Sequence, residues 1–222
     1  MASTTASVVI LISGSGSNLQ AIIDASQTGS CPINIAAVIS NRPDIKGLQR
    51  AKEANIKSLV VDHTQFSGRE DFDQALIKQI DLYQPDLVVL AGFMRILTSD
   101  FVEHYTGRLI NIHPALLPDF PGLNTHERAI ESAVKQHGAS VHFVTTEVDG
   151  GPIILQASVP VKSDDSSEQL AQRVLQQEHL IYPLAIKWFA EKRLVLDKNR
   201  VLLDKVELPK TGLNYAQVME SQ

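Results

Sequence analysis

Short apolar runs alternate with amphipathic stretches through the first half of the chain. Runs rich in Val, Ile and Leu are typical of parallel strands that are buried on both faces. They predict strands over 8–12, 33–39, 58–61, 87–90 and 108–112. Apolar positions at helical spacing predict helices over 18–23, 45–54, 70–83 and 99–105. Because strand and helix recur within about 30 residues of one another, we expect right-handed crossovers and a parallel sheet.

The pattern changes after the fifth predicted strand. Prolines and glycines over 113–124 predict a mobile loop, and helical spacing returns over 127–136. Alternating runs at 139–144 and 153–161 flank the turn sequence Asp-Gly-Gly-Pro, which predicts an antiparallel hairpin. A long helix that begins after Ser166 and a small hairpin over 195–203 complete the elements.

These elements predict an α/β fold. We expect an open, mostly parallel twisted sheet of Rossmann-like type, with helices on both faces and an antiparallel C-terminal hairpin. We expect a single domain over 1–222 with an N-terminal tail, 1–6, and a C-terminal segment, 207–222, whose polar composition favours disorder.

Composition limits the partners. With 222 residues, of which 44% are hydrophobic and 20% charged, the chain can build a sizeable core. A formal net charge of -5 provides no basic surplus for phosphate backbones, so we expect no nucleic-acid partner. No apolar run approaches the roughly 18 residues of a membrane span, and the single cysteine favours a reducing compartment. We therefore expect a cytoplasmic protein without a membrane partner, either a monomer or a homodimer.

The sequence Ser-Gly-Ser-Gly-Ser-Asn, residues 13–18, joins the first predicted strand to the first helix. Glycines allow a tight turn there, and the free N–H groups of a helix start attract phosphate. The dinucleotide fingerprint is incomplete, because Leu19 occupies the position of its third glycine. On these residues alone, the segment is either a phosphate site or an ordinary tight turn.

A second candidate, Asn111-Ile-His113-Pro, ends the fifth predicted strand. Residues two apart in a strand project to the same side, and open α/β sheets bind ligands at this end. An Asn amide can donate to a developing oxyanion, and a His can move a proton near neutral pH. The alternative is a strand-end His bonded to backbone. Asp149 would raise the pKa of His113 if the two were close, although Asp-Gly is also common turn chemistry.

Two further features favour structural roles. Cys31 precedes a proline without a nearby His or Asn, so we do not expect it to be a nucleophile. The seven histidines include no His-Glu-x-x-His spacing, so we expect no metal site.

Together these segments resemble the phosphoribosylglycinamide formyltransferases, the folate-dependent glycinamide ribonucleotide transformylases of purine synthesis. The resemblance covers 7–203, and Asn-x-His-Pro with the following Leu-Leu-Pro is typical of folate-dependent formyl transfer. The Gly-x-Gly-Ser-Asn-Leu loop indicates the enzyme that acts on the ribonucleotide. Ser15 and Ala115 depart from the Asn and Ser that are common in the family.

The resemblance implies that a formyl group passes from 10-formyltetrahydrofolate, a co-substrate, to the amine of glycinamide ribonucleotide. The products are formylglycinamide ribonucleotide and tetrahydrofolate, and no metal is implied. Asn111 would bind the formyl oxygen, a protonated His113 would polarise the same centre and transfer protons, and Asp149 would keep His113 charged. The residues implied for the ribonucleotide phosphate and ribose are Gly16, Ser17, Asn18 and Glu178. Those implied for folate are Arg69, Met94, Arg95, Ile96, Leu97, Asn111, Thr145, Thr146, Glu147, Val148 and Asp149.

Three alternatives share parts of this pattern. A 10-formyltetrahydrofolate hydrolase could use the same trio with water as the acceptor, but we would expect an additional N-terminal regulatory domain. A methionyl-tRNA formyltransferase would need a further C-terminal RNA-binding domain. A non-catalytic nucleotide- or folate-binding module would have no need of Asn111, His113 and Asp149 together.

Overall fold

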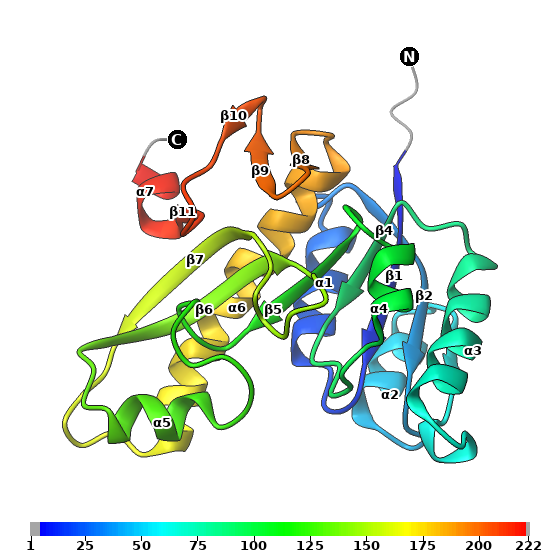
Figure 1. Ribbon diagram of the computed structural model, residues 1–222, viewed down its shortest axis with the longest axis horizontal. Helices are drawn as coiled ribbons and strands as arrows, with labels where there is room; N and C mark the ends of the chain where they lie inside the picture. The colour runs from blue at the N-terminus through cyan, green and yellow to red at the C-terminus, as the bar shows by residue number, and fades with distance from the viewer. Residues whose placement is uncertain (1–4, 221–222) are drawn as a thin grey trace. The chain divides into compact units, whose positions relative to one another are not determined.

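The computed structural model describes residues 5–220 and divides into two compact units, Met1–Ile110 and Asn111–Gln222. Eight strands form a mixed, mostly parallel sheet in the order β11-β7-β6-β5-β4-β1-β2-β3 (Figure 1). A separate antiparallel sheet has the order β10-β9-β8. The predicted α/β fold with a mostly parallel sheet and an antiparallel C-terminal part is therefore confirmed.

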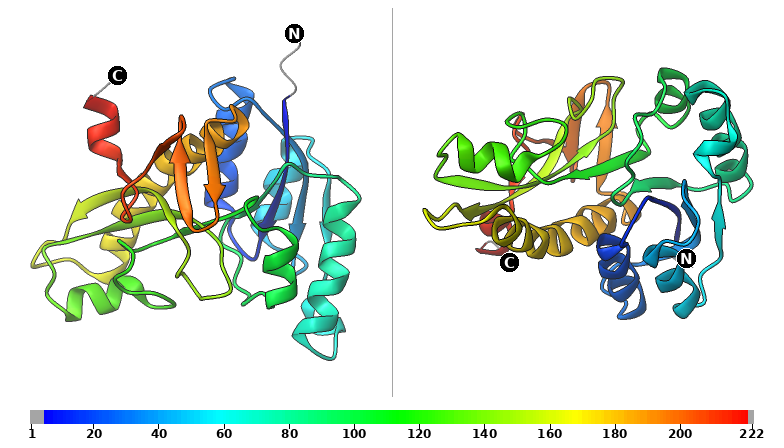
Figure 2. Two further views of the ribbon diagram at one scale, coloured as in Figure 1. Left: turned by 45° about the horizontal axis from the view of Figure 1, so that its top comes forward. Right: turned by 90° about the horizontal axis from the view of Figure 1, so that it is seen from below.

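The first unit is built from parallel β–α repeats. Its elements are β1 (Ala6–Ile12), α1 (Ser17–Gln27), β2 (Ile33–Ser40), α2 (Lys46–Glu53), β3 (Ser58–Val60), the 3-10 helix η1 (His63–Gln65), α3 (Arg69–Asp81), β4 (Leu87–Leu90) and α4 (Ser99–His104). β1 pairs in parallel with β2 and β4, so that Ile10 lies beside both Val38 and Val89. Helices α1 and α2 cover one face of these strands, and α3 and α4 cover the other (Figure 2). This is the arrangement that right-handed crossovers produce.

The second unit is built around an antiparallel pair and a long helix. Its elements are β5 (Leu109–His113, which crosses the division between the units), α5 (Thr125–Glu131), β6 (Gln136–Phe143), β7 (Ile153–Pro160), α6 (Ser167–Ala190), β8 (Leu194–Asp197), β9 (Arg200–Leu203), β10 (Val206–Glu207), β11 (Leu213–Asn214) and α7 (Tyr215–Glu220). A capping box between Ser166 and Gln169 fixes the start of α6. Apolar side chains such as Leu170 and Ile181 are buried on this helix, which packs against β6 and β7.

The helix predicted over 127–136 is too long. Helix α5 ends at Glu131, and Ala133 adopts a left-handed φ of 49°. Gln136 already belongs to β6, where it pairs with Pro160. Pairing with a distant strand thus overrides the local helical pattern.

The C-terminal segment 207–222, for which disorder is expected, also differs. Leu213 of β11 pairs in parallel with Leu155 of β7, and α7 follows directly. A side chain at Gly212 would lie 2.8 Å from the carbonyl carbon of Ile154, so this glycine lets the chain approach β7. At the other end, β1 already includes Ala6; residues 1–4 and 221–222 lie outside the described residues.

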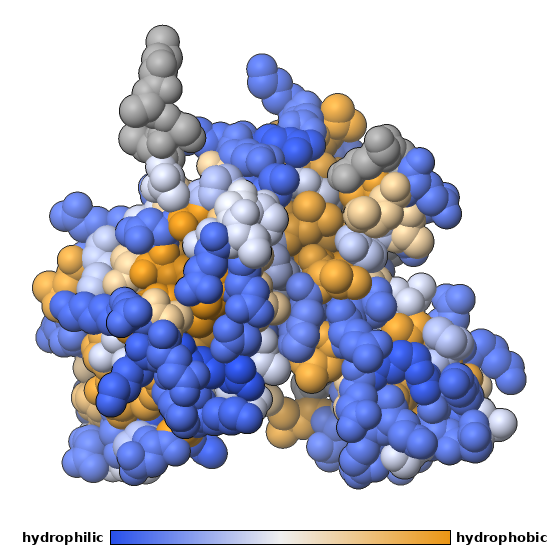
Figure 3. Space-filling view, turned by 180° about the vertical axis from the view of Figure 1, so that it is seen from behind, coloured by the Kyte–Doolittle hydropathy of each residue, from blue (hydrophilic) through white to orange (hydrophobic). Residues whose placement is uncertain are grey.

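Most of the surface seen in Figure 3 is hydrophilic, with smaller groups of apolar side chains between the charged ones. None of the described helices combines the length and the apolar character needed to cross a membrane.

The β6–β7 pair provides a test of the packing. A Cβ atom at Gly138 would lie 2.0 Å from the Ala157 carbonyl oxygen, so Gly138→Ala must push the two strands apart. We expect the free energy of unfolding, measured by urea titration, to fall by about 1–3 kcal/mol. Gly14→Ala is the control, because no atom lies within 4 Å of its added Cβ, and it should change the value by less than about 0.5 kcal/mol. Equal stability of the two variants would contradict this account.

Candidate functional site

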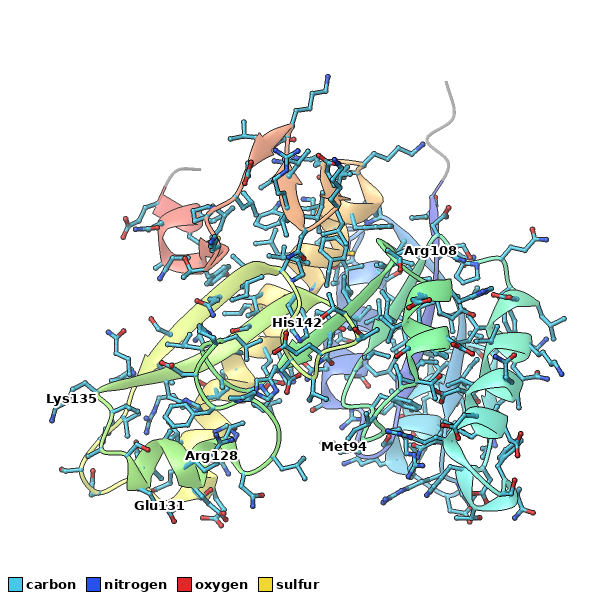
Figure 4. All side chains as sticks on the ribbon, in the orientation of Figure 1. Met94, Arg108, Arg128, Glu131, Lys135 and His142 are labelled. Carbon is cyan, nitrogen blue, oxygen red and sulfur yellow. The ribbon has the colours of Figure 1, made fainter. Side chains whose placement is uncertain are left out.

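Four polar side chains of the second unit meet near the end of β5. His113 is the last residue of β5, Asn111 lies two positions before it, and His142 comes from β6 (Figure 4). His113 Nδ1 lies 3.3 Å from Asp149 Oδ2, and His142 Nε2 lies 3.7 Å from Asp149 Oδ1. Asn111 Nδ2 lies 3.2 Å from His142 Nε2. The structure thus brings Asn111, His113 and Asp149 together, and it adds His142, which the sequence analysis did not single out.

Backbone conformation aims the Asp149 carboxylate at the two histidines. Asp149 has a left-handed φ of 52°, and its Oδ2 accepts a hydrogen bond of 2.9 Å from the Gly122 N–H. A side chain at Gly151 would lie 1.8 Å from the Phe143 carbonyl oxygen, so this turn requires glycine. The conformation of the Asp-Gly-Gly-Pro turn therefore also sets the position of the Asp149 carboxylate.

The two histidines differ in their partners. His113 Nε2 donates to the Phe120 carbonyl at 2.9 Å, and its Nδ1 faces the Asp149 carboxylate, so both nitrogens face acceptors. His142 Nδ1 donates to the Phe143 carbonyl at 2.9 Å, and its Nε2 can accept a hydrogen bond from the Asn111 amide. His142 Nε2 thus lies near both the Asn111 amide and the Asp149 carboxylate, whereas both nitrogens of His113 face acceptors only.

Burial nevertheless lowers the pKa of His113 below its usual value of 6.5. The Phe120 carbonyl and the Asp149 charge raise this pKa, but they do not offset the loss of hydration. Burial therefore acts against the protonated His113 that the family resemblance implies, whereas Asp149 acts in its favour. Burial alone would raise the pKa of Asp149, but the neighbouring His142 ring, the hydrogen bond from the Gly122 N–H and the His113 charge hold it below its usual value.

The loop that follows His113 is fastened to the β6–β7 pair. Ser140 Oγ donates to the Ala115 carbonyl at 2.6 Å and accepts from the Leu117 N–H at 3.0 Å. Gln156 Nε2 donates to Ser140 Oγ and to the Leu117 carbonyl, at 2.7 and 2.9 Å. The start of the segment predicted as a mobile loop is thus held by two buried or half-buried side chains.

Two further histidines pack beside this loop. The His137 ring meets the rings of Phe120 and His126 edge-on, with centroid distances of 5.7 and 5.3 Å. Burial lowers the pKa of His137 to about 4, and it also lowers the pKa of His126. Both rings are therefore neutral at physiological pH.

In the first unit, residues 13–18 form a tight connection between β1 and α1. Gly16 is the N-cap of α1 and has a left-handed φ of 70°, without a side-chain hydrogen bond to cap the helix. A Cβ atom at Gly16 would lie 2.7 Å from the Cα atom of Gly47, so α2 contacts this connection with its backbone. Ser17 and Asn18 begin α1 directly after it. Backbone N–H groups at such a helix start can bind an anion.

The residues of the first unit that are implied for folate lie near the start of α3 and the end of β4. Ser13 Oγ accepts from the Met94 N–H at 2.7 Å and donates to Asn41 Oδ1 at 2.6 Å, which ties 13–18 to the segment after β4. Asp73, buried on α3, accepts from the Thr98 N–H at 2.6 Å. Its pKa is raised by burial, and the charges of Arg69 and Arg95 act against this increase, so both cations lie near Asp73. Met94 and Ile96 expose large apolar side chains, as a ligand-binding segment would.

The remaining implied residues belong to the second unit. Thr145, Thr146, Glu147 and Val148 lead directly into Asp149, and Val148 is exposed. Glu178 is buried on α6. Within residues 5–220, no group of three or more His, Cys, Asp and Glu side chains is placed to hold a metal ion, and Cys31 is buried.

The chain is similar to known proteins along most of its length. A family model described as "Formyl transferase" matches residues 6–186. The chain is 55% identical over 205 residues to the phosphoribosylglycinamide formyltransferase of Escherichia coli (strain K12), covering 92% of this chain and 97% of that protein. The Haemophilus influenzae protein of the same name is 50% identical over the same shares of the two chains. Among solved structures, the phosphoribosylglycinamide formyltransferase from Coxiella burnetii in complex with CHES has a TM-score of 0.91 and 51% identity, and the match covers 95% of this chain and 99% of that one.

The pair His113–Asp149 can be tested by titration. The Asp149 charge raises the pKa of His113, so Asp149→Asn should lower this pKa further. Asn also tolerates the left-handed φ at this position, which keeps the backbone change small. The imidazole resonance of His113, followed by NMR against pH, provides the measurement. Asp119→Asn, which removes an exposed carboxylate from the loop after His113, should leave the pKa of His113 unchanged. An unchanged titration in Asp149→Asn would show that Asp149 and His113 do not interact.

His137 should make the fold sensitive to acid. An unfolded chain binds a proton at this ring near pH 6.5, whereas the folded protein resists protonation down to a pH of about 4. The unfolded state therefore binds more protons as the pH falls through this interval, and the free energy of unfolding decreases, by about 2 kcal/mol at about pH 5. His137→Phe should lose this part of the pH dependence in denaturant titrations at about pH 7.5 and about pH 5. If His137→Phe and the exposed control His104→Phe retain the same pH dependence, His137 is not the source.

Proposed function

The chain belongs to the formyl transferase family and, within it, to the phosphoribosylglycinamide formyltransferases, and from this premise we propose how its residues bind and activate the two substrates. The reaction passes a formyl group to the amine of glycinamide ribonucleotide in purine synthesis. We propose 10-formyltetrahydrofolate as the donor, which leaves as tetrahydrofolate. The observation that carries the assignment of roles is the contact of His113 and His142 with the Asp149 carboxylate beside Asn111.

Asn111 is proposed to bind the formyl oxygen. Attack of the amine on the formyl carbon places negative charge on this oxygen, and an amide N–H can stabilise it. The Asn111 amide has two hydrogens, of which one can point to His142 Nε2 while the other remains for the substrate. His142 is then a positioning residue, because it sets the direction of the amide. No step of the proposal requires a metal.

His113 is proposed to transfer the proton. The attacking amine must lose a proton, and the folate nitrogen must gain one as the carbon–nitrogen bond of the donor breaks. A histidine that burial keeps neutral can accept the first proton, and the adjacent Asp149 carboxylate stabilises the resulting imidazolium. A pKa that is pulled in both directions suits a group that must take and return a proton near neutral pH.

The remaining roles are proposals from the family resemblance and the local geometry. Gly16, Ser17 and Asn18 would hold the ribonucleotide phosphate at the start of α1, and Glu178 would contact the ribonucleotide. Folate would be held by Arg69, by 94–97 and by 145–149. We also propose that the two compact units make up one formyltransferase domain, which the family match across 6–186 supports. A cytoplasmic monomer or homodimer completes the proposal.

Turnover of 10-formyltetrahydrofolate, measured with and without glycinamide ribonucleotide, tests the reaction. Ribonucleotide-dependent turnover is expected; turnover without it would indicate a hydrolase, and folate binding without any turnover would indicate a binding module. His113→Ala should lower kcat by about 10²- to 10⁴-fold, because it removes the proton-transfer group. His104→Ala removes an exposed histidine that pairs with Asp81 and should leave kcat unchanged. Calorimetry should show that His113→Ala still binds the ribonucleotide, and an equal loss of binding would contradict the assigned role.

A further inference from the structure

An arginine of α2 forms hydrogen bonds with the connection between β1 and α1 and with α1 itself. Arg50 Nε donates to the Ser15 carbonyl at 2.9 Å, and Arg50 Nη1 donates to Gln20 Oε1, on α1, at 3.0 Å. We propose that Arg50 is a positioning residue for the phosphate of the ribonucleotide, a role that rests on the proposed function of Gly16, Ser17 and Asn18. Neither the motif nor its spacing in the sequence pointed to this residue.

The first reason is the direction of two peptide groups. The Gly14 carbonyl accepts from the Gly47 N–H at 3.1 Å, and the Ser15 carbonyl accepts from Arg50. In a trans peptide the carbonyl and the following N–H point in opposite directions. Both carbonyls face α2, so the N–H groups of Ser15 and Gly16 point away from it. Arg50 thereby helps to present donors, rather than carbonyl oxygens, to an anion.

The second reason is charge. Besides the Ser15 carbonyl, the guanidinium donates to the neutral amide of Gln20, and within the described part of the chain no salt bridge pairs Arg50 with a carboxylate. Its positive charge therefore adds to that of the helix start, where Gly16 provides no side-chain cap. A phosphate placed at this helix start would be attracted by both.

Helix α2 offers a matched control two residues further on. Lys52 is exposed and lines a surface hollow that Asp44, Asn55 and Ser58 also border. Successive residues turn by about 100° in a helix, so residues two apart lie on nearly opposite sides. Lys52→Ala and Arg50→Ala thus remove the same formal charge from the same helix, but only Arg50 contacts the connection.

The experiment compares Arg50→Ala, Arg50→Lys and Lys52→Ala in steady-state kinetics and in calorimetric titrations with glycinamide ribonucleotide. Arg50→Ala should raise KM and Kd for the ribonucleotide about tenfold, as expected for loss of a charged hydrogen bond, with kcat and KM for the formyl donor changed less than about twofold. Arg50→Lys should show a smaller increase, because Lys retains the charge but not the planar fork. Lys52→Ala should resemble the unmodified protein. The ribonucleotide Kd of Arg50→Ala should also depend less on salt concentration.

Several results would overturn the proposal. One is a ribonucleotide Kd for Arg50→Ala within about twofold of that for Lys52→Ala, well short of the expected loss of a charged hydrogen bond. Another is an equal rise in KM for both substrates, which indicates a general structural role. If Arg50→Ala does not fold, Arg50→Lys decides the question by its Kd alone. The ribonucleotide Kd values decide the role of Arg50, whereas absence of turnover in the unmodified protein would refute the proposed function.

Discussion

The Asp149 carboxylate is the group around which the second unit's polar site is arranged. A carboxylate that is largely shielded from water is costly unless its oxygens are paired, and this half-buried one faces two imidazole rings and one backbone N–H. Satisfying all three fixes other features: a left-handed φ at Asp149, a glycine at 151 and a loop that brings the Gly122 N–H within 2.9 Å. Residues as far apart in the sequence as His113 and Gly151 are therefore constrained by the placement of one side chain.

Opposing forces act on His113 as a result. The protein surrounds the ring with two acceptors that favour a charged imidazolium, yet burial removes the water that would stabilise the charge. Had Asp149 prevailed, His113 would be a permanent cation and could not take a proton from the amine. Had burial acted alone, the imidazolium formed during transfer would be unstable. In the proposed mechanism, this balance lets the proton state of His113 change with the progress of the reaction.

Local sequence patterns predicted the parallel strands, because continuous apolar runs such as 8–12 are fully buried. They also placed Asn111 and His113 on the same side of a strand end. They could not predict His142, Gly47 or Arg50, because these residues act through contacts with segments distant in sequence. For the same reason the sequence did not predict where β6 begins or that β11 forms, because both depend on pairing with β7, which is distant in sequence. Likewise, the pKa direction of His113 depends on burial, which no motif encodes.

At Ser15 and Ala115, which depart from the family pattern, the contact with the rest of the protein is made by the backbone and not by the side chain. Ser15 is exposed, and its contribution is the carbonyl that accepts from Arg50. Ala115 is buried, and its carbonyl accepts from Ser140; a hydroxyl at this position would need a partner of its own in the interior. Neither contact depends on the identity of the side chain at 15 or 115. Any residue at 15 or 115 offers the same carbonyl, whereas the donors come from the side chains of Arg50 and Ser140.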